Sequence, residues 1–192
     1  MGSSNIGIIG CGNISDIYMH NCTHVFENIR IAACADLVYQ KAASQAAKYG
    51  IPKACSVPEL LTDPDIDIVL NLTIPGAHAE ICEAALDAGK SVYVEKPLST
   101  TLAGGVRILK KAKEKGLCVG CAPDTFLGGG IQTCRRIIEE GLIGQPVAAN
   151  GFMLTHGPES WHPRPEIFYQ TGAGPLFDMG PYYLTALVDL MG

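Results

Sequence analysis

The sequence predicts an α/β protein: a doubly wound parallel sheet in its first part, followed by the incomplete start of an α+β second domain. Strand and helix patterns alternate along the chain as far as residue 121, and the alternation stops after Pro123. The strand patterns are continuous apolar runs, as expected for parallel strands that helices cover on both faces. We therefore divide the chain into domains at residues 1–122 and 123–192.

The first domain contains the repeating part of the pattern. We expect strands at Ile6–Ile9, Ile29–Ala35, Ile68–Leu72, Ser91–Val94 and Cys118–Cys121, with a weak strand at Ala54–Cys55. Helical patterns lie between them, at Ser15–Val25, Tyr39–Tyr49, Ala77–Ala88 and Leu102–Lys115. Right-handed crossovers would wind these elements into one sheet, whose ligand binds at the carboxyl ends of the strands.

The second domain has fewer elements. Its sequence predicts a helix at Ile131–Glu140, a strand at Val147–Leu154, a loop from Thr155 to Pro165 and a final apolar helix at Leu176–Met191. A single strand cannot complete a sheet, so this part reads as the opening of a domain.

Composition excludes several classes of protein. Hydrophobic residues make up 47% of the 192 residues and the net charge is −5. No basic cluster points to nucleic acid, and no apolar run approaches the roughly 18 residues of a membrane span. The N-terminus lacks a signal-peptide pattern, so we expect a cytoplasmic protein. Its eight cysteines then read as small apolar residues of a reducing compartment, and no metal site is expected.

A glycine-rich turn follows the first strand and runs directly into the first helix. It reads G-C-G-N-I-S over Gly10–Ser15. In a Rossmann dinucleotide-binding fingerprint, Gly10 would allow the tight turn, Gly12 would let the backbone approach a pyrophosphate, and a small third residue would let helix and strand pack closely. The N–H groups of Asn13 and Ile14 would face the phosphates. A simple strand-to-helix turn is the alternative.

Asp36 ends the second strand pattern, 24 residues after Gly12. A carboxylate at this place can accept hydrogen bonds from the adenosine ribose hydroxyls. It would repel a 2′-phosphate, and no arginine follows within residues 37–39. The position favours NAD over NADP. Asp36 could also cap the helix that begins near Tyr39.

Further polar residues follow later strands at the same edge of the sheet. Thr73, Pro75 and His78 come after the third major strand, where they could line the cofactor cleft; His78 could equally start the next helix. Glu95 and Lys96 come after Ser91–Val94, where the nicotinamide should lie. A lysine in a loop is usually only a solvated charge.

These motifs together resemble one family. The order G-x-G-x-x-S, Thr73-Ile-Pro75-x-x-His78, Glu95-Lys96-Pro97 and Gly172-Ala-Gly174-Pro-Leu-Phe-Asp178-Met-Gly180 is similar to that of the glucose-fructose oxidoreductase / inositol dehydrogenase (Gfo/Idh/MocA) family. The resemblance implies an NAD-dependent dehydrogenase of sugars or polyols and a second domain that often supports homo-oligomers. It also implies that Lys96 and Asp178 touch the reacting hydroxyl.

Two departures from the family pattern matter. The family commonly places a histidine base four residues after the aspartate, where this chain has Tyr182. A phenol, with a pKa of about 10, becomes a usable proton carrier if Lys96 stabilises its phenolate; packing is the alternative role of Tyr182. Family members are also about twice as long, so most strands of the second domain's sheet would be missing.

Other residues carry weaker signals. Trp161 and His162 could form a substrate-contacting loop, since an aromatic face suits a sugar ring, although a plain surface loop would look the same. His20 and His24 share a helix face without a third ligand and read as surface residues.

Two other functions compete with a hydroxyl dehydrogenase. A non-catalytic NAD(H)-binding sensor or regulatory protein on the same scaffold would explain the short second domain and the missing histidine. A hydrolase or lyase that keeps NAD bound and recycles it in each turnover is the third possibility.

Overall fold

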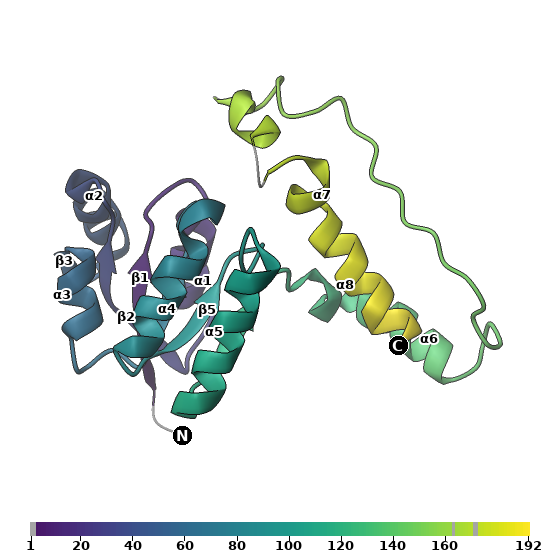
Figure 1. The fold of residues 1–192 in the computed structure, drawn as a ribbon, viewed down its shortest axis with the longest axis horizontal. Coiled ribbons are helices and arrows are strands. Elements are labelled where there is room, and N and C mark those ends of the chain that lie inside the picture. Colours follow the sequence, from purple (N-terminus) through teal and green to yellow (C-terminus); the bar gives the residue numbers. More distant parts are fainter. Residues whose placement is uncertain (1–2, 163, 171–172) are drawn as a thin grey trace. The chain divides into compact units, whose positions relative to one another are not determined.

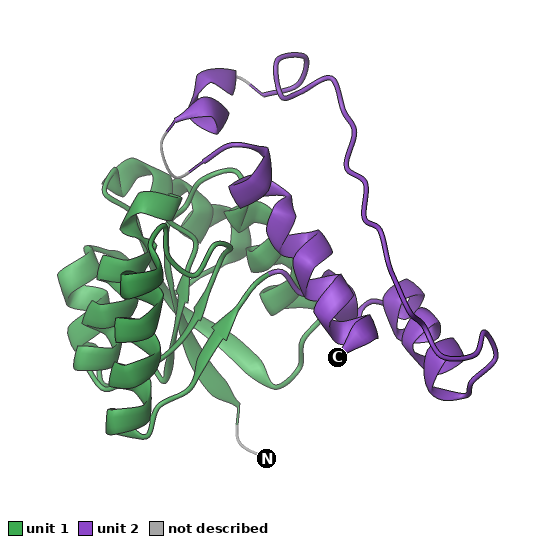
Figure 2. Ribbon diagram, turned by 45° about the vertical axis from the view of Figure 1, so that its right-hand side comes forward, with its two compact units in different colours: residues 1–122 green, residues 123–192 purple. Residues whose placement is uncertain are grey.

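The computed structural model describes residues 3–162, 164–170 and 173–192. The chain forms two compact units, unit 1 over Met1–Ala122 and unit 2 over Pro123–Gly192 (Figure 2).

Unit 1 is built on a six-stranded parallel sheet in the order β3-β2-β1-β4-β5-β6. Its strands are β1 (Ser4–Ile9), β2 (Ile29–Ala35), β3 (Ala54–Cys55), β4 (Ile68–Asn71), β5 (Ser91–Val94) and β6 (Val119–Cys121). The strand order runs outward from β1 in both directions, so the winding reverses between β1 and β4. Such a reversal opens a crevice at the carboxyl ends of the two strands. The predicted fold class is confirmed for this part.

Helices cover both faces of this sheet (Figure 1). One apolar cluster joins the sheet to α1 (Ser15–His24) and α2 (Tyr39–Tyr49). The other joins it to α3 (Val57–Thr62), α4 (His78–Asp87) and α5 (Leu102–Lys115). Each helix therefore buries one apolar face against strands that are themselves apolar on both sides.

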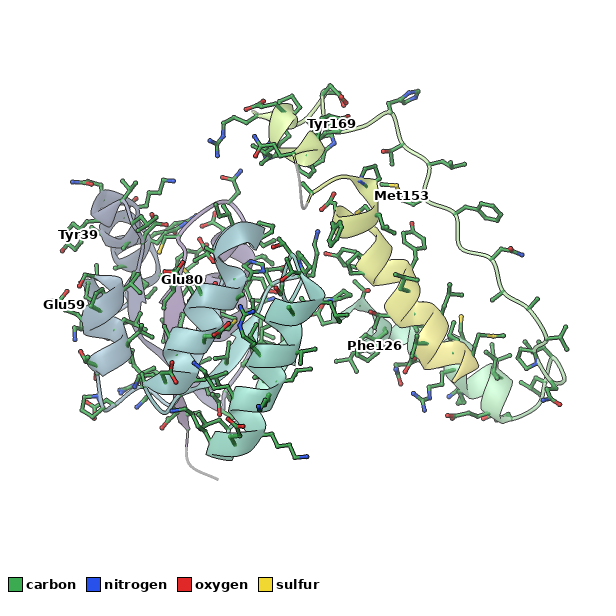
Figure 3. All side chains as sticks on the ribbon, viewed as in Figure 1. Tyr39, Glu59, Glu80, Phe126, Met153 and Tyr169 are labelled. Carbon is green, nitrogen blue, oxygen red and sulfur yellow. The ribbon has the colours of Figure 1, made fainter. Side chains whose placement is uncertain are left out.

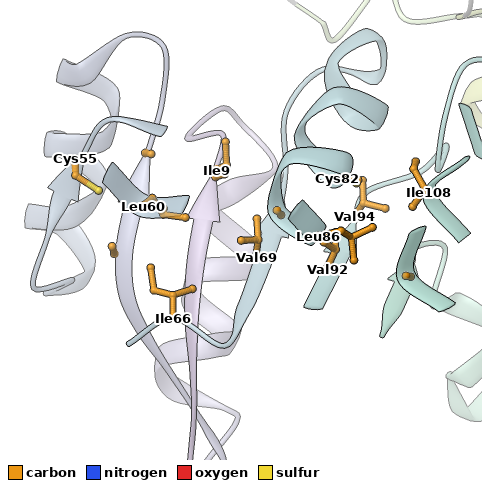
Figure 4. Packing of buried hydrophobic residues seen from close by; sticks show 14 residues of the cluster. Ile9, Cys55, Leu60, Ile66, Val69, Cys82, Leu86, Val92, Val94 and Ile108 are labelled. Carbon is orange, nitrogen blue, oxygen red and sulfur yellow. The ribbon is translucent and has the colours of Figure 1, made fainter. Parts of the chain in front are cut away.

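The second cluster shows how tightly α3, α4 and α5 are held (Figure 4). Leu60, Leu86 and Ile108, one from each helix, are fully buried against Val69 of β4 and Val94 of β5. Truncating such a side chain typically lowers the free energy of unfolding by about 2–5 kcal/mol. This core gives the carboxyl edge of the sheet a rigid base.

Unit 2 is helical within its described residues, 123–162, 164–170 and 173–192. Its helices are the short 3₁₀ helices η2 (Thr125–Leu127) and η3 (Pro165–Tyr169) and the α-helices α6 (Gly129–Glu139), α7 (Pro175–Asp178) and α8 (Gly180–Met191). A 2.6 Å ion pair between Arg135 Nη1 and Asp189 Oδ1 joins α6 to α8.

The predicted strand at Val147–Leu154 is wrong. Residues 145–154 have no regular secondary structure and run as a long connection after α6 (Figure 1). A strand needs a neighbour that accepts and donates its backbone hydrogen bonds. The described residues of unit 2 contain no other strand, and Val147, Phe152 and Leu154 are largely exposed.

The predicted single helix at Leu176–Met191 is also wrong, because the chain forms α7 and α8 with a break at Met179. Pro181 has no backbone N–H and cannot continue the hydrogen-bond pattern of α7, so a new helix begins around it. Pro163 and Gly172, which belong to the predicted loop and to the late glycine motif, lie outside the described residues.

Candidate cofactor and active site

The turn after β1 requires a glycine at its first position. Gly10 has a φ of +103°, and a Cβ atom there would lie 2.6 Å from the backbone carbon and oxygen of Leu72. Any side chain would push β1 away from the chain that leaves β4. Gly10 thus makes the turn possible and also lets the two strands at the reversal of the sheet approach closely, which the sequence analysis did not anticipate.

Gly12 is different, because the protein itself does not need a glycine there. A Cβ atom at Gly12 would meet no atom within 4 Å. Gly12, Asn13 and Ile14 are exposed, and no described residue accepts a hydrogen bond from their backbone N–H groups. Three N–H groups at the start of a ten-residue helix form a cradle suited to a phosphate. The residues present fit a dinucleotide.

Ser15 closes the cradle from inside. Its side chain is fully buried, and its hydroxyl donates a 2.6 Å hydrogen bond to the carbonyl of Gly12. Its backbone N–H donates to the same carbonyl at 3.0 Å. This small residue holds the turn against the helix, which is the packing role predicted for the third position of the motif.

Asp36 lies beside this turn. Its Oδ2 accepts from the N–H of Cys11 at 2.8 Å, and its Oδ1 accepts from the N–H of Val38 at 2.9 Å. A carboxylate has about four acceptor sites, so both oxygens keep capacity for ribose hydroxyls. The alternative role as a helix cap is wrong: α2 is capped by Val38 without a side-chain hydrogen bond.

Cys11, inside the turn, is not a nucleophile. A hydrogen bond with Cys34, and then burial, raise the pKa of the Cys11 thiol above its usual value. The thiol stays protonated at neutral pH and behaves as a small buried residue.

The Glu95-Lys96-Pro97 segment leaves β5 at the same edge of the sheet. Both oxygens of the Glu95 carboxylate are engaged: Oε1 accepts from the Tyr18 hydroxyl at 2.7 Å, and Oε2 accepts from the N–H of Lys96 at 2.9 Å. Tyr18 belongs to α1, the helix that starts at the cradle. Glu95 thus connects the lysine segment to the glycine-rich turn.

His78 lies inside unit 1. It starts α4, as one reading of the sequence expected, and its side chain is 0% exposed. Its Nδ1 lies 2.6 Å from the carbonyl oxygen of Pro97 and its Nε2 lies 3.0 Å from that of Thr73. The ring therefore connects the two loops that follow β4 and β5.

Asn71, at the end of β4, completes this connection. It is fully buried, and its Oδ1 accepts from both the N–H and the hydroxyl of Thr73, at 3.2 and 2.7 Å. Its amide nitrogen donates to the carbonyl of His78 at 3.1 Å. Pro75 lies between these anchors, exposed at the start of a 3₁₀ turn, η1 (Pro75–Ala77).

The predicted catalytic residues belong to different units. Lys96 is in unit 1, whereas Asp178 ends α7 and Tyr182 lies in the first turn of α8, both in unit 2. Asp178 and Tyr182 do not share one helix, although the single helix predicted at Leu176–Met191 would contain both, because the helix breaks at Met179. The grouping of the three side chains stays a prediction.

Unit 2 contains a pocket of about 560 Å³. Trp161, Phe168 and Tyr169 contribute aromatic walls, and Asp178 and His156 contribute polar groups (Met153 and Tyr169 are labelled in Figure 3). His162 is not in the lining, but its ring packs edge-on against Phe168 and Trp161, with centroids 4.9 and 5.5 Å apart. The pocket thus contains one of the two predicted substrate-contacting residues, Trp161.

Two classes of site are not found among the residues described. No group of three or more histidine, cysteine, aspartate or glutamate side chains is placed to hold a metal ion; His20 and His24 stack on each other at the surface of α1. Within the described part of the chain, no helix is both long and apolar enough to cross a membrane.

Comparison with known protein families identifies both units. Residues 4–122 match the family model described as "Oxidoreductase family, NAD-binding Rossmann fold", and residues 131–192 match the "GFO/IDH/MocA C-terminal domain". The chain belongs to the GFO/IDH/MocA oxidoreductase family. It has the family's NAD-binding Rossmann domain, as the sequence motifs predict.

Individual relatives give the same picture. The chain is 27% identical to an inositol 2-dehydrogenase of Salmonella paratyphi B over 86% of this chain and 50% of the relative. It is 35% identical to a 1,5-anhydro-D-fructose reductase of Ensifer adhaerens over 73% of this chain and 42% of that relative. A myo-inositol dehydrogenase of Lactobacillus casei, crystallised with NAD(H) and myo-inositol, is 28% identical and superposes with a TM-score of 0.71. This match covers 76% of this chain and 44% of that one. The chain thus spans half or less of the length of these relatives.

Tyr18 and Asn71 are the polar residues of this edge that the sequence analysis missed. Neither belongs to a short motif, and Tyr18 is 77 residues from the glutamate it contacts. For Asn71, a polar residue in an otherwise apolar strand pattern is a signal that could have been used.

Proposed function

We propose that this protein is an NAD-dependent oxidoreductase acting on a hydroxyl-bearing carbon of a sugar, polyol or related compound. The observation that carries the proposal is the cradle of three unpartnered N–H groups at Gly12–Ile14, next to the Asp36 carboxylate at the sheet reversal. NAD bound there supplies the hydride-accepting carbon of the nicotinamide.

Unit 1 would hold the cofactor along this edge. The N–H groups at the start of α1 bind the pyrophosphate and Asp36 binds the adenosine ribose, which disfavours the extra phosphate of NADP. Ile14, Leu37 and Ile74 follow β1, β2 and β4 and expose 45, 99 and 72% of their surface. Such exposed apolar side chains suit contact with flat cofactor rings. Thr73 and Lys96 follow β4 and β5 on the nicotinamide side.

The reacting hydroxyl would meet three side chains of this chain. Lys96 donates a hydrogen bond to the substrate oxygen and, as a cation, stabilises the phenolate of Tyr182. Tyr182 accepts the proton of the hydroxyl during oxidation and returns it during reduction. Asp178 contacts the same hydroxyl and orients the substrate.

The aromatic pocket of unit 2 supports a sugar or polyol as the substrate. Trp161, Phe168 and Tyr169 provide flat apolar faces, and Asp178 provides an acceptor at the same pocket. Both features suit a ring that has apolar C–H faces and hydroxyls at its edge. Relatives that act on inositols and on an anhydro sugar by their names point to the same class.

A panel of inositols, anhydro sugars and aldoses tests this function. The 192-residue chain and a version extended to the length of its relatives are each assayed with NAD⁺, following nicotinamide absorbance. We expect the extended protein to reduce NAD⁺ with at least one cyclic polyol or sugar. Tight NADH binding without turnover on the whole panel would contradict the enzymatic proposal and favour a sensor.

A further inference from the structure

The Glu95-Lys96-Pro97 segment is fixed by side chains from two other elements. Tyr18, from α1, donates to Glu95 Oε1, and the ring of His78, from α4, lies 2.6 Å from the carbonyl oxygen of Pro97. These contacts fall on either side of Lys96. Neither Tyr18 nor His78 is needed to bind phosphate or ribose in the arrangement described above.

We propose that Tyr18 and His78 are positioning residues that set where Lys96 stands relative to the nicotinamide half of the cofactor. The inference rests on the proposed function, because it takes the nicotinamide to lie beside this segment. It goes further by assigning roles to a helix residue and to a buried histidine that do not themselves touch the reacting atoms.

The Tyr18 contact connects two halves of the cofactor site. α1 begins at the N–H cradle, and its Tyr18 reaches the glutamate that precedes Lys96 in sequence. The acceptor is a carboxylate, and hydrogen bonds to charged groups are stronger than neutral ones. The second oxygen of Glu95 accepts from the N–H of Lys96, so an error in the position of Glu95 would move Lys96 directly.

The His78 contacts work from the opposite side. Pro97 has no backbone N–H, so its segment has one fewer donor to hold it in place. A buried imidazole is unfavourable unless its N–H finds an acceptor, and each nitrogen of His78 faces one, the carbonyl of Pro97 or that of Thr73. A residue that only starts a helix does not need a ring, whereas a residue that contacts the carbonyls of two loops at once needs a side chain with two separated polar atoms.

Binding of NADH and of ADP-ribose to the 192-residue chain, measured by calorimetry, tests the inference. ADP-ribose has the adenosine and pyrophosphate groups of the cofactor but lacks nicotinamide. The variants are Tyr18→Phe, His78→Gln and His78→Asn. Tyr49→Phe is the matched control: the Tyr49 hydroxyl bonds to Asp16, at its Oδ1 and carbonyl oxygen, and not to the lysine segment.

We expect Tyr18→Phe and His78→Gln to weaken NADH binding about tenfold and to leave ADP-ribose binding unchanged. In His78→Asn the amide nitrogen can take the place of Nδ1 and donate to Pro97, so its NADH affinity should lie closer to that of the unchanged chain. Tyr49→Phe should alter neither affinity.

Three results would overturn the inference. An equal loss of NADH and ADP-ribose binding would mean that Tyr18 and His78 only support the fold. Unchanged NADH binding in Tyr18→Phe would mean that these side chains do not position Lys96. This variant removes a single oxygen atom, so its result decides between the outcomes even if the His78 variants fail to fold. If the unchanged chain binds neither ligand, the proposed cofactor site itself is wrong; the first two results leave that site standing.

Discussion

Replacing Gly12 with valine should abolish NADH binding and leave the protein folded. A Cβ atom at Gly12 meets no protein atom within 4 Å, and the residue is exposed, so we expect the fold to accept a side chain there. The same side chain would fill the space in front of the N–H groups of Asn13 and Ile14, where the pyrophosphate must approach. We expect the Kd for NADH to rise at least a hundredfold, about 2.7 kcal/mol, with an unchanged urea midpoint.

Gly10→Ala provides the matched comparison, because it should destabilise the fold instead of blocking the cofactor. The added Cβ would lie 2.6 Å from the backbone of Leu72, in a residue whose φ is +103°. Such strain should lower the free energy of unfolding by at least about 2 kcal/mol. Normal NADH binding by a folded Gly12→Val variant would show that no cofactor approaches this turn.

The second large effect concerns the reacting groups. In the protein extended to the length of its relatives, Tyr182→Phe should lower kcat by about 10²–10⁴-fold, the usual contribution of a positioned acid-base group. NADH affinity should not change, because the hydroxyl of Tyr182 is assigned to the substrate. Lys96→Met should lower kcat by a similar factor without weakening ADP-ribose binding. Both effects are measured as rates at saturating substrate.

Tyr183→Phe is the control for this pair. Tyr183 is the next residue of α8, and its ring lies next to Gly151. Removal of its hydroxyl should leave kcat near that of the unchanged enzyme. If Tyr182→Phe and Tyr183→Phe both retain full turnover, Tyr182 is a packing residue and another group carries the proton.

The fold of unit 1 could be predicted because its signals are local. Each apolar run of four or more residues is a strand in the described structure, and α2 and α5 have the predicted bounds. The one α-helix of unit 1 that the sequence analysis missed, α3, has six residues, which is too short to show helical periodicity. Its capping box, Ser56 with Glu59, is a sequence signal that would have identified it.

Unit 2 was harder to predict because the structure of a segment there depends on which other segments it contacts. The Val147–Leu154 segment has an apolar strand pattern, but a strand forms only against another strand, and sequence pattern does not report that. The break between α7 and α8 was predictable in principle from Pro181, which the apolar pattern on both sides concealed.

The residues of the candidate site also differ in how far the sequence predicts them. Gly10, Gly12 and Asp36 could be placed from spacing, since the turn and the next strand fix their geometry. Roles that depend on contacts across the sheet could not: Tyr18 reaches Glu95, and His78 reaches Pro97, across 77 and 19 residues of sequence. Sequence reasoning left His78 either in the cofactor cleft or at the start of the next helix; it does start α4, but the contacts of its ring with two loops could not be foreseen.

Titration of the 192-residue chain with NADH and NADPH, followed by nicotinamide fluorescence, is the sharpest test of the proposed NAD site. We expect saturable NADH binding and NADPH binding at least about tenfold weaker, because the Asp36 carboxylate repels a 2′-phosphate at the ribose. Equal or tighter NADPH binding would contradict the role of Asp36. No binding of either nucleotide by a chain that circular dichroism shows to be folded would contradict the cofactor site as a whole.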